Sequence, residues 1–243
     1  MDQNHSAAIS DGSFGADWRP RSSSPGNERE KTGRRSFLGR GAAAAVAAMA
    51  AISGGKARAS NPNHLPSLYA NENVREFQAI QTHENAHVAF LVNALGAHAR
   101  PKPSFVNLTQ PNLVTFAQTS RALENTGVGA YLGAAPIIFN PAYLAAAGSI
   151  LTIEARHSGY INVLLNLIMT ENAAGDVVNF DVPLTQQQVV AAAGPLITNL
   201  NGGPPLAFST TPSAANDIAI LNFALALEYL EAEFYNINVP IFT

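Results

Sequence analysis

The stretch NFALALEYLEAEFYN, residues 222–236, places three glutamates inside an otherwise apolar segment. Its apolar residues recur every three or four positions, which is the spacing of one buried face of an α-helix. At 3.6 residues per turn, Glu228 lies on that face, Glu231 lies about 60° round from it, and Glu233 points away. A carboxylate buried without a partner costs folding free energy, so proteins rarely keep one without a use. We therefore expect a helix over residues 214–237 that carries Glu228 into a polar site.

Three further segments have the same periodicity, over roughly residues 71–98, 113–134 and 141–170. No segment alternates polar and apolar residues over a comparable length, as a half-buried strand would. Four amphipathic helices predict an all-α fold, a four-helix bundle. The buried stripes of the three segments include Phe77, Ile80, Glu84, His87 and Leu91 in the first, Phe116, Ser120, Glu124, Val128 and Tyr131 in the second, and Ile150, Ile153, His157, Ile161, Leu164 and Ile168 in the third.

The connections between the predicted helices differ in length. Residues 134–141 form a short link with two prolines, so the second and third helices should be antiparallel neighbours. Residues 99–112 are rich in proline and long enough to cross the length of the bundle. Residues 171–213 form a longer connection, with one short helix expected after a Thr185 cap. We expect this long linker to lie on the bundle surface.

The few polar residues on the apolar stripes form a repeated pattern. Two helices carry Glu-x-x-His, a spacing that places both side chains on one helix face, and the other two carry Glu-x6-Tyr. Four carboxylates that converge in a bundle core cannot all stay ionised unless cations neutralise them. Carboxylate and imidazole ligands suit iron or manganese, so the pattern predicts a site for two metal ions. The pairs are Glu84 with His87, Glu154 with His157, Glu124 with Tyr131, and Glu228 with Tyr235.

Four motifs resemble the helix motifs of the ferritin-like superfamily, in particular the exported ferritin-like domain family that includes plant desiccation-related proteins. The motifs are FALALEYLEAEFY, HENAHVAFLVNALGA, ENTGVGAYLGAAP and ILTIEARH, and they cover most of residues 74–157 and 216–235. The resemblance implies two bound iron ions, or manganese in their place. It also implies a redox activity, either the oxidation of ferrous iron or the reduction of oxygen or peroxide.

The resemblance further implies a role for each residue of the pattern. Glu231 remains an alternative ligand to Glu228, or a neighbour that supports the ligands, because the two lie close on one helix. In the assignment that the resemblance implies, Glu84 and Glu154 bridge the two ions, His87 and Glu228 complete one metal site, and His157 and Glu124 complete the other. Tyr131 and Tyr235 would orient the ligands through hydrogen bonds or, as the alternative, pass electrons.

The order of the helices departs from the family pattern. Ferritin-like bundles begin with the Glu-x6-Tyr helix that comes last here, over residues 214–237. Chain ends that lie close together at the surface permit such a circular permutation, with residues 171–213 as the new linker. The alternative is a domain swap, in which the last helix completes a neighbouring subunit of a homo-oligomer. We favour permutation within one chain because the linker is long enough to span a single bundle.

The N-terminal residues contain the parts of an export signal. Residues 1–31 are polar and irregular, which predicts disorder. They are followed by GRRSFLGR, which contains Arg34 and Arg35, by an alanine-rich apolar run, and by a small-residue site that ends at Ala59. RRSFL resembles the twin-arginine signal. We therefore expect cleavage after Ala59 and export through the twin-arginine machinery to the periplasm or the extracellular space.

Cleavage after Ala59 would divide the chain into the signal region, residues 1–59, and one bundle domain, residues 60–243. Nine of the 14 Lys and Arg residues precede residue 60, which leaves five against twelve Asp and Glu and a formal net charge of −7. That charge argues against a nucleic-acid partner. The chain has no cysteine, which excludes disulfides, a thiolate nucleophile and iron–sulfur clusters.

Two alternatives from other classes remain open. The segment His83-Glu84-x-x-His87 is also the H-E-x-x-H motif of zinc hydrolases, in which two histidines bind zinc and the glutamate is the base. That interpretation leaves the second Glu-x-x-His pair and both tyrosines unexplained. A ferritin-like bundle can also be a non-catalytic structural or desiccation-related and stress-related envelope protein. The metal content of the purified protein, followed by the optical change when oxygen or peroxide meets the ferrous protein, distinguishes these alternatives from a di-metal oxidoreductase.

Overall fold

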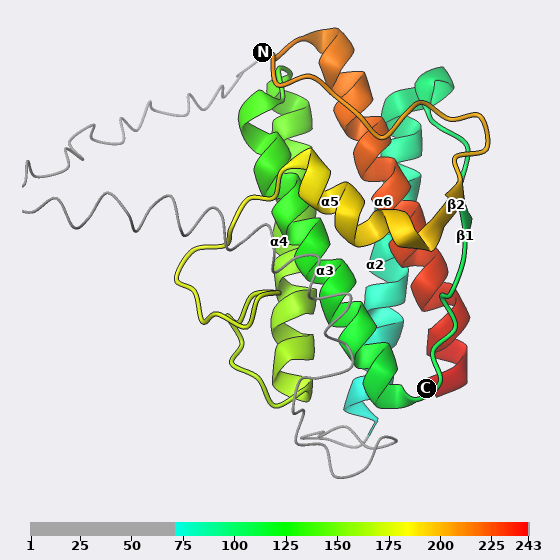
Figure 1. The fold of residues 1–243 in the computed structure, drawn as a ribbon, viewed down its shortest axis with the longest axis vertical. Helices are drawn as coiled ribbons and strands as arrows, with labels where there is room; N and C mark the ends of the chain where they lie inside the picture. The colour runs from blue at the N-terminus through cyan, green and yellow to red at the C-terminus, as the bar shows by residue number, and fades with distance from the viewer. Residues whose placement is uncertain (1–70, 243) are drawn as a thin grey trace, which may run out of the picture.

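The computed structural model describes residues 71–242, and four long helices account for most of them (Figure 1). α2 packs mainly against α6, and α3 against α4, and the two members of each pair run in opposite directions (Figure 1). The predicted all-α four-helix bundle is confirmed. The twin-arginine segment and the cleavage after Ala59 lie outside the described residues. The four helices are α2 (Glu72–Leu95), α3 (Leu113–Ala134), α4 (Pro141–Leu164) and α6 (Ala214–Phe242).

The ends of the long helices follow local capping rules. Asn112 and Asn140 precede α3 and α4, and their side chains accept hydrogen bonds from the backbone N–H groups of Thr115 and Ala142. Gly96 caps the C-terminal end of α2, and its φ of 54° lies in the left-handed region that glycine adopts without strain. The shorter helical elements are η3 (Gly96–His98), η4 (Ala135–Ile137), α5 (Gln186–Ala193) and η5 (Gly194–Leu196).

The third predicted helix ends earlier than its periodicity indicated. α4 stops within the predicted range because the chain turns at Asn166, which takes a left-handed conformation with φ 60°. The side-chain amide of Asn162 donates to the carbonyl oxygens of Met169 and Glu171 and holds this turn against the helix. Ile168, which was expected on the buried stripe, is 57% exposed. Its helical spacing therefore did not reflect a continuing helix.

The structure differs from the sequence-based expectations in two further features. α6 continues through Phe242, beyond the predicted end at residue 237. Two short strands, β1 (Ser104–Phe105) and β2 (Ile197–Asn199), pair antiparallel and join the connection after α2 to the connection before α6. The sequence did not reveal them because strands of two and three residues are too short for an alternating pattern.

The long connection between α4 and α6 lies across one face of the bundle, where α5 packs on α3 (Figure 1). The predicted Thr185 cap is confirmed, since Thr185 and Gln188 form a reciprocal capping box at the start of α5. The backbone N–H of Leu184 donates to the carbonyl oxygen of Gly129 at 2.8 Å. A Cβ atom at Gly133 would lie 2.0 Å from the carbonyl oxygen of Leu184. The glycines of α3 therefore let the connection approach the helix backbone.

Two buried apolar clusters fill the bundle interior and leave a polar layer between them. On α2, Ile80 belongs to one cluster and Leu91 to the other, with Glu84 between them. On α4, Ile161 and Ile150 belong to the same two clusters, again on either side of an acidic turn. Between residues 71 and 242, none of the helices combines the length and apolar character that crossing a membrane requires.

We predict that Gly133→Ala destabilises the protein by about 1–3 kcal/mol, because the new methyl group would meet backbone that cannot move aside freely. Gly148→Ala is the matched control, since an added Cβ there has nothing within 4 Å. It should be neutral or stabilise by about 0.5–1 kcal/mol, because alanine is the better helix former. Urea unfolding followed by circular dichroism measures both variants. Equal changes would contradict the close approach of the connection to α3.

Candidate metal centre

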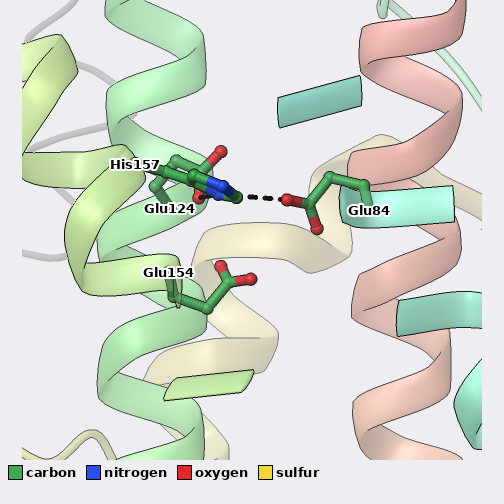
Figure 2. A group of neighbouring side chains, drawn as sticks. All are labelled: Glu84, Glu124, Glu154 and His157. Atoms are coloured by element: carbon green, nitrogen blue, oxygen red, sulfur yellow. Dashed lines mark hydrogen bonds and ion pairs between the residues drawn. The ribbon is translucent and has the colours of Figure 1, made fainter. Parts of the chain in front are cut away.

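All four long helices send polar side chains into the layer between the apolar clusters. The four glutamates of the predicted site are at most 1% exposed and the two histidines at most 9%. The structure thus brings all six predicted ligand residues into one buried cluster, and Figure 2 shows four of them around the interior. They are Glu84 and His87 from α2, Glu124 from α3, Glu154 and His157 from α4, and Glu228 from α6.

The six residues form two overlapping groups, each with the donor set of a metal site. Within each group, one ligand atom from every residue lies within 4.8 Å of the others. Glu84 and Glu154 belong to both groups, so two ions held there would share two carboxylates. One group adds Glu124 and His157, and the other adds His87 and Glu228.

The Nδ1 atom of each histidine points into the carboxylates. His157 Nδ1 lies 3.0 Å from Glu124 Oε2 and 3.1 Å from Glu84 Oε1, and Figure 2 shows the Glu84 carboxylate facing His157 across the interior. His87 Nδ1 lies 3.2 Å from an oxygen of Glu84, 3.2 Å from Glu228 and 3.3 Å from Glu154. Each imidazole therefore presents the same nitrogen to its group of acids.

Several oxygens of this cluster are buried without a hydrogen bond. Both oxygens of Glu154 and Oε1 of Glu84 accept none from the residues that the structure describes. Two of these three oxygens have only an ion-pair contact, Glu154 Oε1 with His87 Nδ1 at 3.3 Å and Glu84 Oε1 with His157 Nδ1 at 3.1 Å. Such orphaned acceptors cost folding free energy when nothing compensates them. Hard oxygen donors beside two imidazole nitrogens are the ligands that iron and manganese take. The residues present therefore fit a divalent metal centre, and the two shared carboxylates are the ones with unpaired oxygens.

The pKa values show how the cluster is balanced when no cation is bound. Burial and the charges of Glu84 and Glu124 raise the pKa of Glu154 well above its usual range. Burial would also raise the pKa of Glu84, but the imidazoles of His157 and His87, whose Nδ1 atoms lie 3.1 and 3.2 Å from its oxygens, outweigh burial and hold that pKa at about 2. Burial lowers the pKa of His87, yet the carboxylates around it raise that pKa to about 12. Protons thus take the place that cations would fill.

The two tyrosines bind the glutamates crosswise. The Tyr131 hydroxyl on α3 donates to Glu228 Oε1 on α6 at 2.5 Å. The Tyr235 hydroxyl on α6 donates to Glu124 on α3. The sequence spacing had paired each tyrosine with the glutamate of its own helix, whereas each hydroxyl reaches the glutamate of the facing helix. Both hydrogen bonds leave one oxygen of the glutamate directed at the cluster and orient that carboxylate.

Glu231, the alternative ligand, lies near the cluster but outside both groups. It is 3% exposed, and its Oε2 has no hydrogen-bond partner within residues 71–242. A Cβ at Gly127 would lie 2.5 Å from Glu154 Oε2 and 3.4 Å from Glu231 Oε1, so both carboxylates occupy the space left by that glycine. Burial and then the charge of Glu154 raise the pKa of Glu231 well above its usual range. Glu233, by contrast, forms a partly exposed ion pair with Lys102.

His83 contacts the cluster in a way that sequence reasoning missed. Its Nδ1 lies 2.9 Å from Nε2 of His157, so it reaches the histidine of α4 instead of the acids around His87. In a zinc hydrolase, His83 and His87 would bind one ion together, and neither candidate metal group in the described part of the chain contains His83. The geometry does not support the zinc-hydrolase alternative. The H-E-x-x-H motif had indicated His83 only as a candidate zinc ligand.

The fold and the site together define a four-helix-bundle protein with a buried carboxylate and histidine cluster that can hold metal ions. A family model described as a ferritin-like domain matches residues 41–167 and 216–240, more than half of the chain. The protein belongs to this ferritin-like family. The unmatched segment between the two parts contains α5 and β2, within the long connection. Searches of curated proteins and of solved structures returned no match.

We predict that the metal-free protein loses stability as the pH rises from 6.5 to 9. Burial lowers the pKa of His157, but Glu124 and Glu84 raise it from 6.5 to about 9, and burial raises the pKa of Glu228 from 4.5 to about 7. The folded state therefore holds protons in this range that the unfolded chain releases, so stability falls as pH rises. The contribution of His157 is complete below pH 6.5 and is lost as the pH passes 9.

Thermal unfolding at pH 6.5, 7.5 and 9, with chelator and with added manganese, measures this effect. The metal-loaded protein should keep its stability over the same range, because metal binding releases the protons in question. The depressed pKa of Glu84 has the opposite effect only below about pH 4.5, outside the range tested. A melting temperature of the chelated protein that is constant or rises would contradict the prediction.

Proposed function

We propose that the protein is a ferritin-like di-metal carboxylate protein that binds two iron or manganese ions and has a redox role. The observation that carries the proposal is the pair of overlapping donor groups whose shared members, Glu84 and Glu154, have buried oxygens without hydrogen bonds. When bound, two such ions supply one-electron steps between their divalent and trivalent states, suited to oxidising ferrous iron or reducing oxygen or peroxide.

The protein's own residues would prepare and protect this chemistry. The four glutamates offer negative charge that offsets the charge of the ions. The hydroxyls of Tyr131 and Tyr235 hold one oxygen of Glu228 and of Glu124, which limits the positions of those carboxylates. The apolar clusters on either side exclude bulk water, so interactions between charges within the layer are strong.

We further propose that the helix order is a circular permutation within one chain. In the bundle, each Glu-x6-Tyr helix pairs with a Glu-x-x-His helix, α6 with α2 and α3 with α4, so the two halves are alike. With α6 placed first, the order α6, α2, α3, α4 matches the family pattern. The connection before α6 crosses one face of the bundle and reaches the end at which α6 begins (Figure 1). A monomer that binds both ions is the expected state, whereas a domain swap requires a dimer or larger assembly.

We also propose that the protein is exported through the twin-arginine route. Its support is the sequence alone, with Arg34 and Arg35 before an alanine-rich run and Ala59 at the end of a small-residue site. We predict that the secreted form begins at Ser60 and that replacing both arginines by lysine retains the uncleaved chain in the cytoplasm. Mass spectrometry of cytoplasmic and exported fractions measures this. Export of the double variant at the wild-type level, or an exported chain that keeps its first residues, would contradict this part of the proposal.

Metal content of the purified monomer tests the central proposal. We predict about two ferrous ions per wild-type chain after anaerobic loading and removal of free iron. Glu84→Gln and Glu154→Gln should each reduce binding at both positions, because each removes a charge that both donor groups share. Glu124→Gln and Glu228→Gln should each abolish one position. Glu233→Gln, which changes an acid of α6 that pairs with Lys102 outside the cluster, is the matched control and should keep both.

The same samples test the redox role. Admitting oxygen or peroxide to the ferrous protein should change its absorption spectrum and convert the iron to the ferric state, and the Glu84→Gln variant should lose this change. Light scattering coupled to gel filtration gives the mass of the loaded species and so tests the permutation. Metal bound without any response to oxygen or peroxide would support a structural role for the centre. Absence of bound metal in the wild-type chain would overturn the di-metal proposal.

A further inference from the structure

The second ring nitrogen of His157 is held by a side chain from another helix. His157 Nδ1 faces Glu84 and Glu124, and its Nε2 lies 2.9 Å from Nδ1 of His83. The two rings are nearly parallel, with an interplanar angle of 5° and centroids 5.2 Å apart. His83 belongs to α2 and His157 to α4, so the contact bridges the two Glu-x-x-His helices at the level of the cluster.

The positions of the protons follow from this arrangement. A histidine that binds a metal through Nδ1 carries its proton on Nε2 and donates it to an outer partner. His157 would therefore donate to Nδ1 of His83, which accepts, and His83 would carry its own proton on Nε2. The hydrogen bond selects the tautomer of His157 that can bind a metal and fixes the angle of its ring.

The other half of the cluster lacks this support. Aligning the two Glu-x-x-His segments places His83 opposite Ile153, because each directly precedes the glutamate. Isoleucine offers no acceptor, and in the described part of the chain no hydrogen bond to Nε2 of His87 is found. The side chain of His87 is also more exposed, at 11% against 6% for His157. The two halves are alike in their donor atoms and differ in what orients the imidazole.

We propose that His83 is a positioning residue that makes the metal site of Glu124 and His157 the tighter of the two and the first to fill. The inference rests on the proposed di-metal function and deepens it, since the proposed function requires two ions but no order between them. An imidazole that is already oriented loses less freedom when it binds, so its ion binds more tightly. Removing an outer hydrogen-bond partner of a metal-binding histidine lowers metal affinity about 10–100-fold.

Calorimetric titration of the full chain with Mn²⁺ under argon tests the proposal without any measurement of activity. The wild-type chain should bind in two steps of different affinity. His83→Ile, which copies the residue of the other half, should weaken the tighter step about 10–100-fold and leave the weaker step unchanged, so that the two steps converge. His83→Asn, whose amide oxygen can accept the hydrogen bond from His157, should restore much of the difference.

Two further variants assign the steps to the two halves. In a Glu228→Gln chain, the remaining step should belong to the Glu124 and His157 site and show the full effect of His83→Ile. In a Glu124→Gln chain, the remaining step should be weaker and insensitive to His83→Ile. His98→Ile replaces an exposed histidine of η3 and is the control for loss of an imidazole elsewhere on the protein. Circular dichroism of each metal-free variant at the temperature of titration establishes that it is folded.

The outcomes separate this inference from the proposed function. Two wild-type steps of equal affinity, an equal weakening of both steps by His83→Ile, or no effect of that change would each overturn the role of His83 and leave the di-metal proposal intact. Failure of His83→Asn to recover any affinity would also count against a role through the hydrogen bond. A wild-type chain that binds neither Mn²⁺ nor Fe²⁺ would overturn the proposed function, and the inference about His83 with it.

Discussion

The carboxylate of Glu154 lies in the centre of the bundle with both oxygens buried and neither accepting a hydrogen bond from the described residues. Glu84 lies beside it in both donor groups, and Glu124 and Glu228 flank the pair. Like charges at this range, removed from water, cannot all persist without compensation. Protons provide that compensation in the free protein, and cations would provide it in a metal-bound one. The other side chains of the interior limit the positions of these four carboxylates.

The surrounding structure limits where each acid can go. Tyrosines from facing helices take one oxygen of Glu124 and one of Glu228, and apolar clusters close the layer on both sides. Gly127 leaves room for the Glu154 and Glu231 carboxylates, where any larger residue would meet an oxygen at once. Glu231 adds a further buried acid that neither donor group uses. Burial and the charge of Glu154 raise its pKa well above the usual range, which favours the neutral form and so lowers the repulsion that it adds.

The two halves of the bundle are similar in motif and different in setting. Each contributes a Glu-x6-Tyr helix and a Glu-x-x-His helix, and the crosswise tyrosine contacts repeat in both. The likeness stops at His83 and Ile153, which precede corresponding glutamates and give one histidine an outer hydrogen-bond partner and the other none. The connection that carries α5 adds a second difference, because it packs on α3, where glycines allow a close approach.

Much of this fold and site could be predicted from local patterns. The spacing of apolar residues indicated all four helices, and the range of α3 matched its predicted residues because Asn112 caps it and its stripe is continuous. The end of α4 was missed because Asn166 leaves the helix while Ile168 keeps a helical spacing. The strands β1 and β2 were missed because their partners lie far apart in the sequence and each is too short for a pattern.

For the site, the sequence by itself determined which acids and histidines share a helix face, since that depends only on the 3.6-residue repeat of the backbone. Together with the Glu-x-x-His and Glu-x6-Tyr spacings, it indicated all six members of the cluster, from Glu84 to Glu228, while Glu231 stayed open as an alternative to Glu228. Only the tertiary structure decided that Tyr131 donates its hydrogen bond to Glu228 and Tyr235 to Glu124. It likewise decided that His83 contacts His157. Those choices depend on how neighbouring helices face one another, and no spacing within a single helix contains that information.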